Sequence, residues 1–186
     1  MLKTKETKII FKNQYLELQN NIVIDINTNK EFEHIKIIEN EAVKPGAVVL
    51  CQYNDKFLLI ENYRYGIDSL SLELPRGYIE KTETLENCAI RELYEETNIL
   101  FKKNVDKIIK LGEVAINSSF IASKVPIYLI IVNQNIKNIK LKTEEQIQSY
   151  EWYKMDQISN DILNGKIFDT FTINAMMFYN LYYKVF

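Results

Sequence analysis

Residues 77–99 read GYIEKTETLENCAIRELYEETNI and predict a turn followed by a strongly acidic helix. Three glutamates fall near the end of that helix, Glu92, Glu95 and Glu96. Residues four apart on a helix lie one above the other, so Glu92 and Glu96 project together, with Glu95 on the adjoining row. Neighbouring carboxylates repel one another, and a divalent cation that takes oxygen ligands relieves the repulsion. The spacing therefore predicts a metal site.

The residues before this helix indicate which way it faces. Residues 72–77 (LELPRG) alternate apolar and polar side chains like a strand and then reach a proline and a glycine, which favour a turn. Thr82 is the predicted N-cap of the helix. An apolar stripe at helical spacing is available for the core: Leu85, Ala89 and Leu93. Most Glu-rich helices are simply solvated, and it is this context that favours acids facing the preceding loop.

Six residues of this stretch also match a known signature. A glycine is followed at fixed intervals by a glutamate, an Arg-Glu pair and a Glu-Glu pair: Gly77, Glu83, Arg91, Glu92, Glu95 and Glu96. The pattern resembles the Nudix box, the signature of hydrolases that cleave a nucleoside diphosphate linked to another group. Asn98 stands where that family has its final glycine. Asn tolerates a left-handed backbone best after glycine, so we expect Asn98 to end the helix in that conformation.

The resemblance extends over most of the chain, to the ADP-ribose pyrophosphatase branch of the Nudix family. The stretches that carry it are 61–65 (ENYRY), 72–77, 111–115 (LGEVA), 143–145 (TEE) and 165–172 (GKIFDTFT). It implies an α/β fold, the Nudix α/β/α sandwich with a mixed sheet, plus a small N-terminal antiparallel β section. It also implies an enzyme, a pyrophosphatase that uses Mg²⁺, with Mn²⁺ as the alternative ion.

The resemblance implies roles for the residues around the metal. Glu92 and Glu96 are similar to the family's principal magnesium ligands, and Glu95 stands close enough to hold a second ion or its water. The carbonyl of Arg76 matches a backbone ligand of the metal. Arg91 is expected to orient the glutamates through a charge-assisted hydrogen bond. All three glutamates and Arg91 are thus predicted catalytic residues.

Other matches concern the base and the substrate. In this branch the catalytic base comes from the loop before the last strand, which corresponds to Glu144 or Glu145. Glu145 is preferred and is also a candidate metal ligand, the alternative being two exposed loop acids. Arg64, Glu73 and Arg76 are candidate substrate-binding residues. For Arg64 and Glu73 the competing interpretation is an ion pair at the ends of two strands.

Length and hydropathy patterning suggest two sections. At 186 residues and 47% hydrophobic content, the chain supports one good core. Residues 1–42 are predicted to form a β-rich dimerisation section, and residues 43–186 the Nudix hydrolase domain. In the first section, short strands separated by Asn-containing turns are predicted at 8–11, 15–18, 22–26 and 32–38. In the second, strands are predicted at 47–52, 57–62, 108–116, 127–132 and 148–153, with mostly helix from residue 155.

Charge and cysteine usage restrict the partners and the compartment. The net charge of −2 is evenly distributed without a basic stripe, which argues against a nucleic-acid partner. No leader-like segment or apolar run of membrane-spanning length is present, so neither export nor a membrane is predicted. Cys51 and Cys88 are isolated and are interpreted as buried thiols, which predicts a cytoplasmic protein. The single histidine, His34, is expected on a strand surface and gives little support to a Ser-His-Asp site.

The assembly and the substrate follow from the resemblance. In this branch two subunits exchange the N-terminal sheet and share each active site, so a homodimer is implied. A short sheet with unpaired edges would also be marginal alone. The expected partner is a small nucleoside diphosphate sugar, and the expected reaction is hydrolysis of ADP-ribose to AMP and ribose 5-phosphate. Three aromatic side chains are unranked candidates for stacking on adenine: Phe11, Tyr15 and Phe32.

Two alternatives remain open. Many ADP-ribose enzymes carry a proline in a loop downstream of the box, and the corresponding residues 116–121 (INSSFI) lack it. Without this proline, ADP-glucose, GDP-mannose or a dinucleotide are alternatives to ADP-ribose as the substrate. The chain could instead be a non-catalytic nucleotide-sugar-binding sensor. Such modules generally lose acids from the box and gain a DNA-binding segment, and neither feature is found in this sequence.

Overall fold

The computed structural model describes residues 1–39, 46–136, 139, 141 and 147–184. The chain divides into two compact units. The N-terminal unit consists of Met1–Pro45 and Ala115–Lys124, and the sandwich unit consists of Gly46–Val114 and Val125–Phe186. A separate role for residues 1–42 stays a prediction. The membership of Ala115–Lys124 in the N-terminal unit was not anticipated from the sequence.

The N-terminal unit contains an antiparallel three-stranded sheet of β1 (Leu2–Lys12), β2 (Leu16–Asp25) and β3 (Glu31–Glu39). The two strands predicted at 15–18 and 22–26 are in fact the single strand β2, so that division was wrong. Polar side chains between them suggested a turn, but they find partners on the neighbouring strands. Asn20 Nδ2 donates to Glu33, and Asn21 Oδ1 accepts from the Thr7 hydroxyl.

The segment Ala115–Lys124 extends this small sheet along β3. Ile37 and Ile121 form a parallel β-bridge. The N–H of Ile37 donates to the carbonyl of Phe120 at 2.7 Å, and the N–H of Ala122 donates to the carbonyl of Ile37 at 2.9 Å. The loop at 116–121, which lacks the family's proline, is therefore held by backbone hydrogen bonds to the N-terminal sheet.

The sandwich unit is built on a mixed sheet of seven strands. Its main path runs β10-β5-β4-β9-β8, with β6 paired to β5 and β7 paired to β4. Only β4 and β9 run parallel among these pairs. The bounds are Gly46–Tyr53 (β4), Lys56–Arg64 (β5), Ser69–Glu73 (β6), Arg76–Tyr78 (β7), Lys107–Val114 (β8), Val125–Val132 (β9) and Ile147–Lys154 (β10). The strands predicted at 47–52 and 57–62 correspond to β4 and β5. They form an antiparallel hairpin in which Tyr53 lies opposite Lys56.

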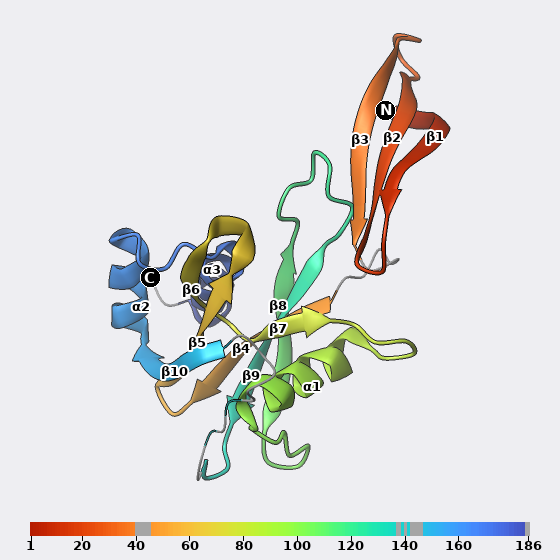
Figure 1. Cartoon of the computed structure of the whole chain (residues 1–186). Coiled ribbons are helices and arrows are strands. Elements are labelled where there is room, and N and C mark those ends of the chain that lie inside the picture. Colours follow the sequence, from red (N-terminus) through yellow and green to blue (C-terminus); the bar gives the residue numbers. More distant parts are fainter. Residues whose placement is uncertain (40–45, 137–138, 140, 142–146, 185–186) are drawn as a thin grey trace. The chain divides into compact units, whose positions relative to one another are not determined.

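Helices cover both faces of this sheet, as the sequence predicted (Figure 1). Alternate residues of β4 belong to two different cores. Ala47 and Val49 pack in a cluster with α1 (Leu85–Thr97), whereas Val48 and Leu50 pack in a cluster with α2 (Met155–Leu163) and α3 (Thr170–Tyr183). A short 3₁₀ turn, η1 (Tyr65–Ile67), follows β5. None of the helices in the described part of the chain combines the length and apolar character needed to cross a bilayer.

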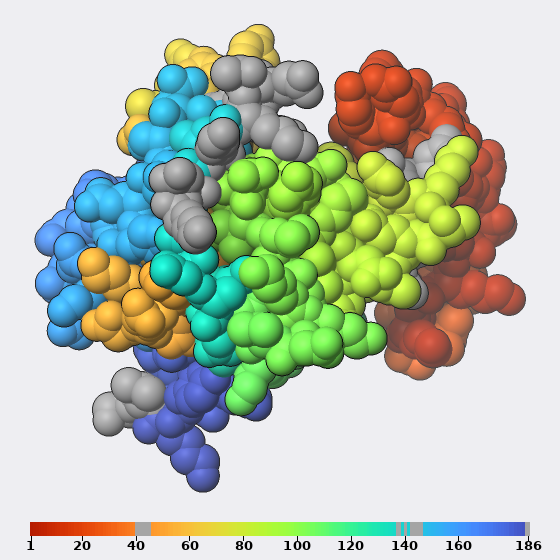
Figure 2. Space-filling model, turned by 90° about the horizontal axis from the view of Figure 1, so that it is seen from below, coloured from red at the N-terminus to blue at the C-terminus, as the bar shows by residue number. Residues whose placement is uncertain are grey.

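The ends of α1 are defined by side-chain and backbone hydrogen bonds. Thr84 is the N-cap, its hydroxyl accepting from the N–H of Asn87 at 3.1 Å. The predicted cap Thr82 was wrong, because that residue lies earlier in the turn with a φ of 70°. Asn98 ends the helix in the left-handed conformation, as predicted, with a φ of 59°. The outer side of α1 reaches solvent at Tyr94, which is 42% exposed, and Figure 2 shows the helix, in green, on this face.

Candidate active site

Helix α1 packs against the short strand β7, and two of its carboxylates are buried there. Glu92 is 7% exposed and Glu96 is 4% exposed. The backbone N–H of Arg76 donates to Glu96 Oε2 at 3.1 Å. A Cβ added to Gly77 would lie 2.2 Å from the carboxylate of Glu92, so only glycine leaves room for that group. Strand β7 and helix α1 thus bring Gly77 against Glu92 and the backbone of Arg76 against Glu96.

Arg91 lies among the acids of the box. Its Nη1 donates to Glu92 Oε1 at 2.7 Å and to Glu95 Oε2 at 2.8 Å. Its Nη2 donates to Glu83 Oε2 at 3.0 Å and to the carbonyl of Tyr78 at 2.7 Å. A guanidinium offers five donors in a fixed plane, which suits it to hold several carboxylates at once. Arg91 therefore offsets part of the repulsion between the acids and fixes their orientation.

The charges in this cluster stabilise one another. Burial alone would lower the pKa of Arg91, but hydrogen bonds to Glu83 and Glu95 and the charge of Glu92 raise it overall. The same arginine, through its hydrogen bond, lowers the pKa of Glu83 below its usual range. Glu83 also accepts from the backbone N–H of Glu80, so it holds the turn before α1. Both shifts favour the charged forms, so Arg91 and Glu83 remain an ion pair at neutral pH.

Glu92 and Glu96 have the ligand chemistry that a hard divalent cation prefers, namely carboxylate oxygens. Both are buried carboxylates, and the space beside Gly77 admits one of them without a competing side chain. Within the described residues, no three Asp, Glu, His or Cys side chains come together closely enough to hold a metal ion. Mg²⁺ is commonly bound by one or two carboxylates, with waters and substrate phosphates completing its octahedron. Two buried carboxylates suit a site of that kind, and the metal roles of Glu92, Glu95, Glu96 and the Arg76 carbonyl stay predictions.

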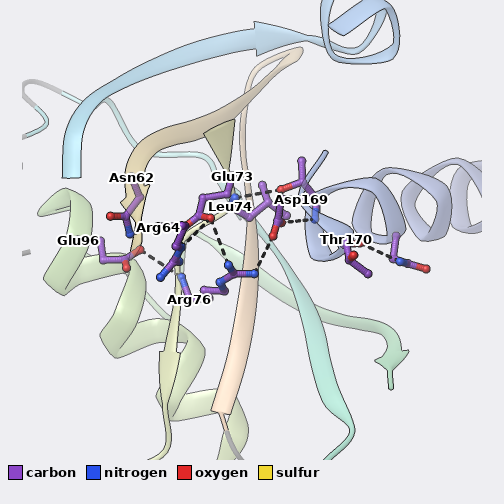
Figure 3. A network of polar contacts seen from close by, with 10 residues as sticks. Asn62, Arg64, Glu73, Leu74, Arg76, Glu96, Asp169 and Thr170 are labelled. Carbon is purple, nitrogen blue, oxygen red and sulfur yellow. Dashed lines mark hydrogen bonds and ion pairs between the residues drawn. The ribbon is translucent and has the colours of Figure 1, made fainter. Parts of the chain in front are cut away.

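A second polar cluster surrounds Glu73, at the end of β6 (Figure 3). This carboxylate is fully buried, and three side chains donate to it. Arg64 forms a two-pronged contact through Nε and Nη2, Arg76 Nη2 lies 3.2 Å away, and Asn62 Nδ2 lies 3.4 Å away. Burial on its own would lower the pKa of Arg64, but Glu73 raises it overall. A buried carboxylate requires such partners, so the strand-end ion pair is real.

Arg64, Glu73 and Arg76 also border a cavity of about 540 Å³ in the sandwich unit. Small-molecule sites commonly have volumes of roughly 300–1,000 Å³. The side chain of Arg64 is 37% exposed, so it can meet a ligand while it holds Glu73. The residues lining the cavity come from β5, η1, β6, β7 and the start of α3: Tyr63, Arg64, Tyr65, Gly66, Ile67, Ser71, Glu73, Arg76, Phe168, Asp169 and Thr170.

Arg76 connects the cavity to the box. Its backbone N–H binds Glu96, whereas its guanidinium lines the cavity and contacts Glu73 and Asp169. The structure therefore brings together two groups of predicted residues. Glu92, Glu95, Glu96 and Arg91 form one, and Arg64, Glu73 and Arg76 form the other.

Sequence reasoning missed two residues near this site. Asp169 is the N-cap of α3, and its carboxylate also accepts from Arg76 Nη1 at 2.9 Å. Thr172 is fully buried, and its hydroxyl accepts from the N–H of Leu74 at 3.2 Å. An Asp just before an apolar helix is an N-cap signal, which could have located the start of α3. Nothing local could have shown that Asp169 contacts Arg76.

Other predicted residues belong to the N-terminal unit or fall outside the described part of the chain. Glu144 and Glu145 lie outside the described residues. The three candidate stacking aromatics are exposed within the N-terminal unit: Phe11, Tyr15 and Phe32. Cys51 and Cys88 are buried free thiols, as predicted, and burial raises the pKa of both.

The sequence is similar to those of two bacterial proteins. The chain is 35% identical over 106 residues to the ADP-ribose pyrophosphatase of Bacillus subtilis (strain 168), a match that covers 55% of this chain and spans only 56% of that relative. It is 25% identical over 182 residues to the methanol dehydrogenase activator of Bacillus methanolicus, covering 96% of this chain and 92% of the relative.

A solved structure shares the fold at low sequence identity. The crystal structure of an ADP compounds hydrolase superposes with a TM-score of 0.78 and 14% identity, covering 98% of this chain and 94% of the other. The family model described as the NUDIX domain matches residues 43–171. That match includes every residue of the box and of the cavity-lining set, and it spans well over half of the sequence. The chain therefore belongs to the Nudix family.

Proposed function

We propose that this protein is a Mg²⁺-dependent pyrophosphatase that cleaves the diphosphate bond of a nucleoside diphosphate sugar, with ADP-ribose hydrolysed to AMP and ribose 5-phosphate. The observation that carries the proposal is the position of Arg76. Its backbone holds the box carboxylate Glu96, and its side chain lines the cavity of about 540 Å³. A substrate in that cavity would reach the acidic centre.

The choice of ADP-ribose rests on similarity and on the chemistry of the cavity. One relative is an ADP-ribose pyrophosphatase, and the structural match is an ADP compounds hydrolase. Arginine donors and carboxylate acceptors line the cavity, a combination that suits phosphate oxygens and sugar hydroxyls. Because residues 116–121 lack the family's proline, ADP-glucose, GDP-mannose and dinucleotides are the alternative substrates.

The roles of the chain's own residues follow from their contacts. Glu92 and Glu96 would hold the cation, and Arg91 keeps Glu92 in place through its hydrogen bond. Arg64 and Arg76 would donate to the substrate. Magnesium, when bound, neutralises phosphate oxygens and lowers the pKa of bound water. We propose that a loop glutamate, Glu145 in preference to Glu144, takes the proton from the attacking water.

A substrate panel tests the proposed function. The purified protein should be incubated with ADP-ribose, ADP-glucose, GDP-mannose, NADH, diadenosine polyphosphates and deoxynucleoside triphosphates, with and without Mg²⁺. We expect AMP and ribose 5-phosphate from ADP-ribose, at the highest kcat/KM of the panel and only with the metal. Turnover restricted to nucleoside triphosphates would contradict the substrate class. Tight binding without turnover would instead identify a sensor.

Two matched substitutions identify the base. Glu145→Gln is expected to lower kcat by about 10²-fold, because general-base catalysis contributes on the order of 10²–10⁴-fold. Glu144→Gln is expected to change kcat by less than about threefold, since the proposal assigns the proton transfer to Glu145 alone. Initial rates with ADP-ribose measure both. The reverse pattern would move the base to Glu144, and two silent variants would remove it from this loop.

We also propose a homodimer that exchanges the N-terminal sheet. Every residue of β1 is exposed in the isolated chain, including Ile9, Ile10 and Phe11, and such a sheet face favours association. Sedimentation of the full chain measures its oligomeric state, and a monomer at micromolar concentration would refute the proposal. The buried free thiols Cys51 and Cys88 are the support for a cytoplasmic location.

A further inference from the structure

The start of α3 is attached to the segment between β6 and β7 by hydrogen bonds. Asp169 Oδ2 accepts from both the N–H and the hydroxyl of Thr172 at 2.8 Å. The Thr172 hydroxyl in turn accepts from the backbone N–H of Leu74. Thr172 and Leu74 are both fully buried, so neither can exchange this contact for water. The first turn of α3 thereby fixes the backbone at Leu74.

The Arg76 side chain is held from three sides. Asp169 Oδ1 accepts from Nη1 at 2.9 Å, and Glu73 Oε2 accepts from Nη2 at 3.2 Å. The guanidinium also lies over the ring of Phe171, 4.7 Å from its centroid. A planar cation that is paired, hydrogen-bonded and stacked has little rotational freedom left. Two of these three contacts, Asp169 and Phe171, come from the start of α3.

These contacts act on the crossing between β6 and β7, which reaches its new strand partner at Arg76, opposite Val48. β6 pairs with β5 and β7 pairs with β4, so the chain changes partners between Glu73 and Arg76. One backbone hydrogen bond in this crossing runs from Val49 N–H to the Pro75 carbonyl. The crossing ends at the Arg76 N–H, which donates to Glu96. Any shift of the crossing would therefore move that donor away from the Glu96 carboxylate.

We propose that Asp169 and Thr172 are positioning residues for Glu96, which they orient through the Leu74–Arg76 backbone and the clamped Arg76 side chain. This inference rests on the proposed function, because it assumes that Glu96 holds the cation. It adds a third element, the first turn of α3, to the strand and helix that carry the box. Groups that orient metal ligands in this way are typically worth about 10–100-fold in metal affinity or activity when removed.

The decisive variant is Asp169→Asn in the full chain. Asparagine caps a helix about as well as aspartate, so α3 should keep its start. Its amide cannot satisfy Arg76 as a carboxylate does, because its NH₂ group is a donor that would face another donor. Thr172→Val is the second variant, since it removes the acceptor for Leu74 at nearly constant volume, and Thr172→Ser restores the hydroxyl. Asp161→Asn is the matched control, because Asp161 pairs with Lys166 at 3.1 Å and neither residue lines the cavity.

The readout is Mn²⁺ binding by titration calorimetry without substrate, together with kcat and KM for ADP-ribose. In each of Asp169→Asn and Thr172→Val, the Kd for Mn²⁺ is expected to rise about 10-fold and kcat to fall about 10-fold. Thr172→Ser and Asp161→Asn are expected to match the parent. Circular dichroism of each variant confirms that the helices are intact.

The outcomes separate this inference from the proposed function. If Asp169→Asn and Thr172→Val both bind Mn²⁺ as tightly as the parent protein, the positioning role is overturned, whether or not KM rises. The hydrolase proposal would still stand. A parent protein that binds Mn²⁺ but turns over no member of the substrate panel would refute the proposed function. The positioning role would still be supported if the two variants then bound Mn²⁺ more weakly. A parent that fails to bind Mn²⁺ would overturn the inference.

Discussion

Glu96→Gln should lower kcat for ADP-ribose hydrolysis by on the order of 10²-fold or more, because preorganised charge at the reacting centre is usually the largest catalytic contribution. Glutamine is nearly isosteric with glutamate and still offers an oxygen to the Arg76 N–H, which now donates to Glu96 Oε2. The local structure should therefore persist while the negative charge is lost. Steady-state rates at several Mg²⁺ concentrations would show a higher metal requirement as well as the lower kcat.

The matched control for this variant is Glu86→Gln. Glu86 lies in the first turn of the same helix and is exposed, so its replacement removes the same charge from α1 without touching β7. Its rate is expected to stay within about twofold of the parent, since exposed charges of this kind contribute little. Equal rates for Glu96→Gln and the parent would show that the box acids are not the metal centre. A sensor would show no turnover in any of the three proteins.

Gly77→Ala should abolish most of the activity while leaving the fold almost intact. The added Cβ would lie 2.2 Å from the Glu92 carboxylate, which stands at the end of a flexible side chain. The carboxylate can rotate away at small cost, but it then leaves Arg91 and the candidate metal position. We expect kcat/KM to fall about 10–100-fold, as for other changes that misplace a metal ligand. Kinetic assays and thermal unfolding on the same preparation would measure both properties.

Gly46→Ala provides the contrasting case. At this position the added Cβ would lie 1.9 Å from the backbone carbonyl oxygen of Gly77, which cannot move without displacing β7. Overpacking of this kind typically costs about 1–3 kcal/mol of unfolding free energy. We therefore expect Gly46→Ala to lower the melting temperature clearly, whereas Gly77→Ala should not. A large stability loss in Gly77→Ala would show that Glu92 is held more rigidly than its side-chain freedom implies.

Local signals in the sequence were sufficient for the elements that carry the box. The apolar stripe of α1 and the left-handed Asn98 depend on near neighbours, and both were predicted correctly. The two-sided burial of β4 follows from an unbroken apolar run, typical of a strand covered on both faces. Thr82 was wrong as a cap because two threonines stand two residues apart, and only the backbone conformation of the turn selects Thr84.

Long-range contacts explain what the sequence could not show. Arg76 and Asp169 are 93 residues apart, and their ion pair depends on where the sheet places α3. Arg64 and Glu73 were left open between a substrate role and an ion pair. The structure shows that they form the pair and border the cavity at the same time. The sequence pattern does not predict the ion pair or the cavity, because both depend on strands that meet only in the folded sheet.

The pairing of Ala115–Lys124 with β3 bears on how this protein can evolve. A shorter homologue that began at Gly46 would leave the backbone groups of Phe120 and Ala122 without the strand residue Ile37 to which they bond. The N-terminal sheet is therefore not a detachable module, although it precedes the rest of the chain in sequence. Insertions, losses and substitutions in β3 should therefore co-vary with changes in residues 116–121. A chimaera of two homologues should keep both segments from the same parent.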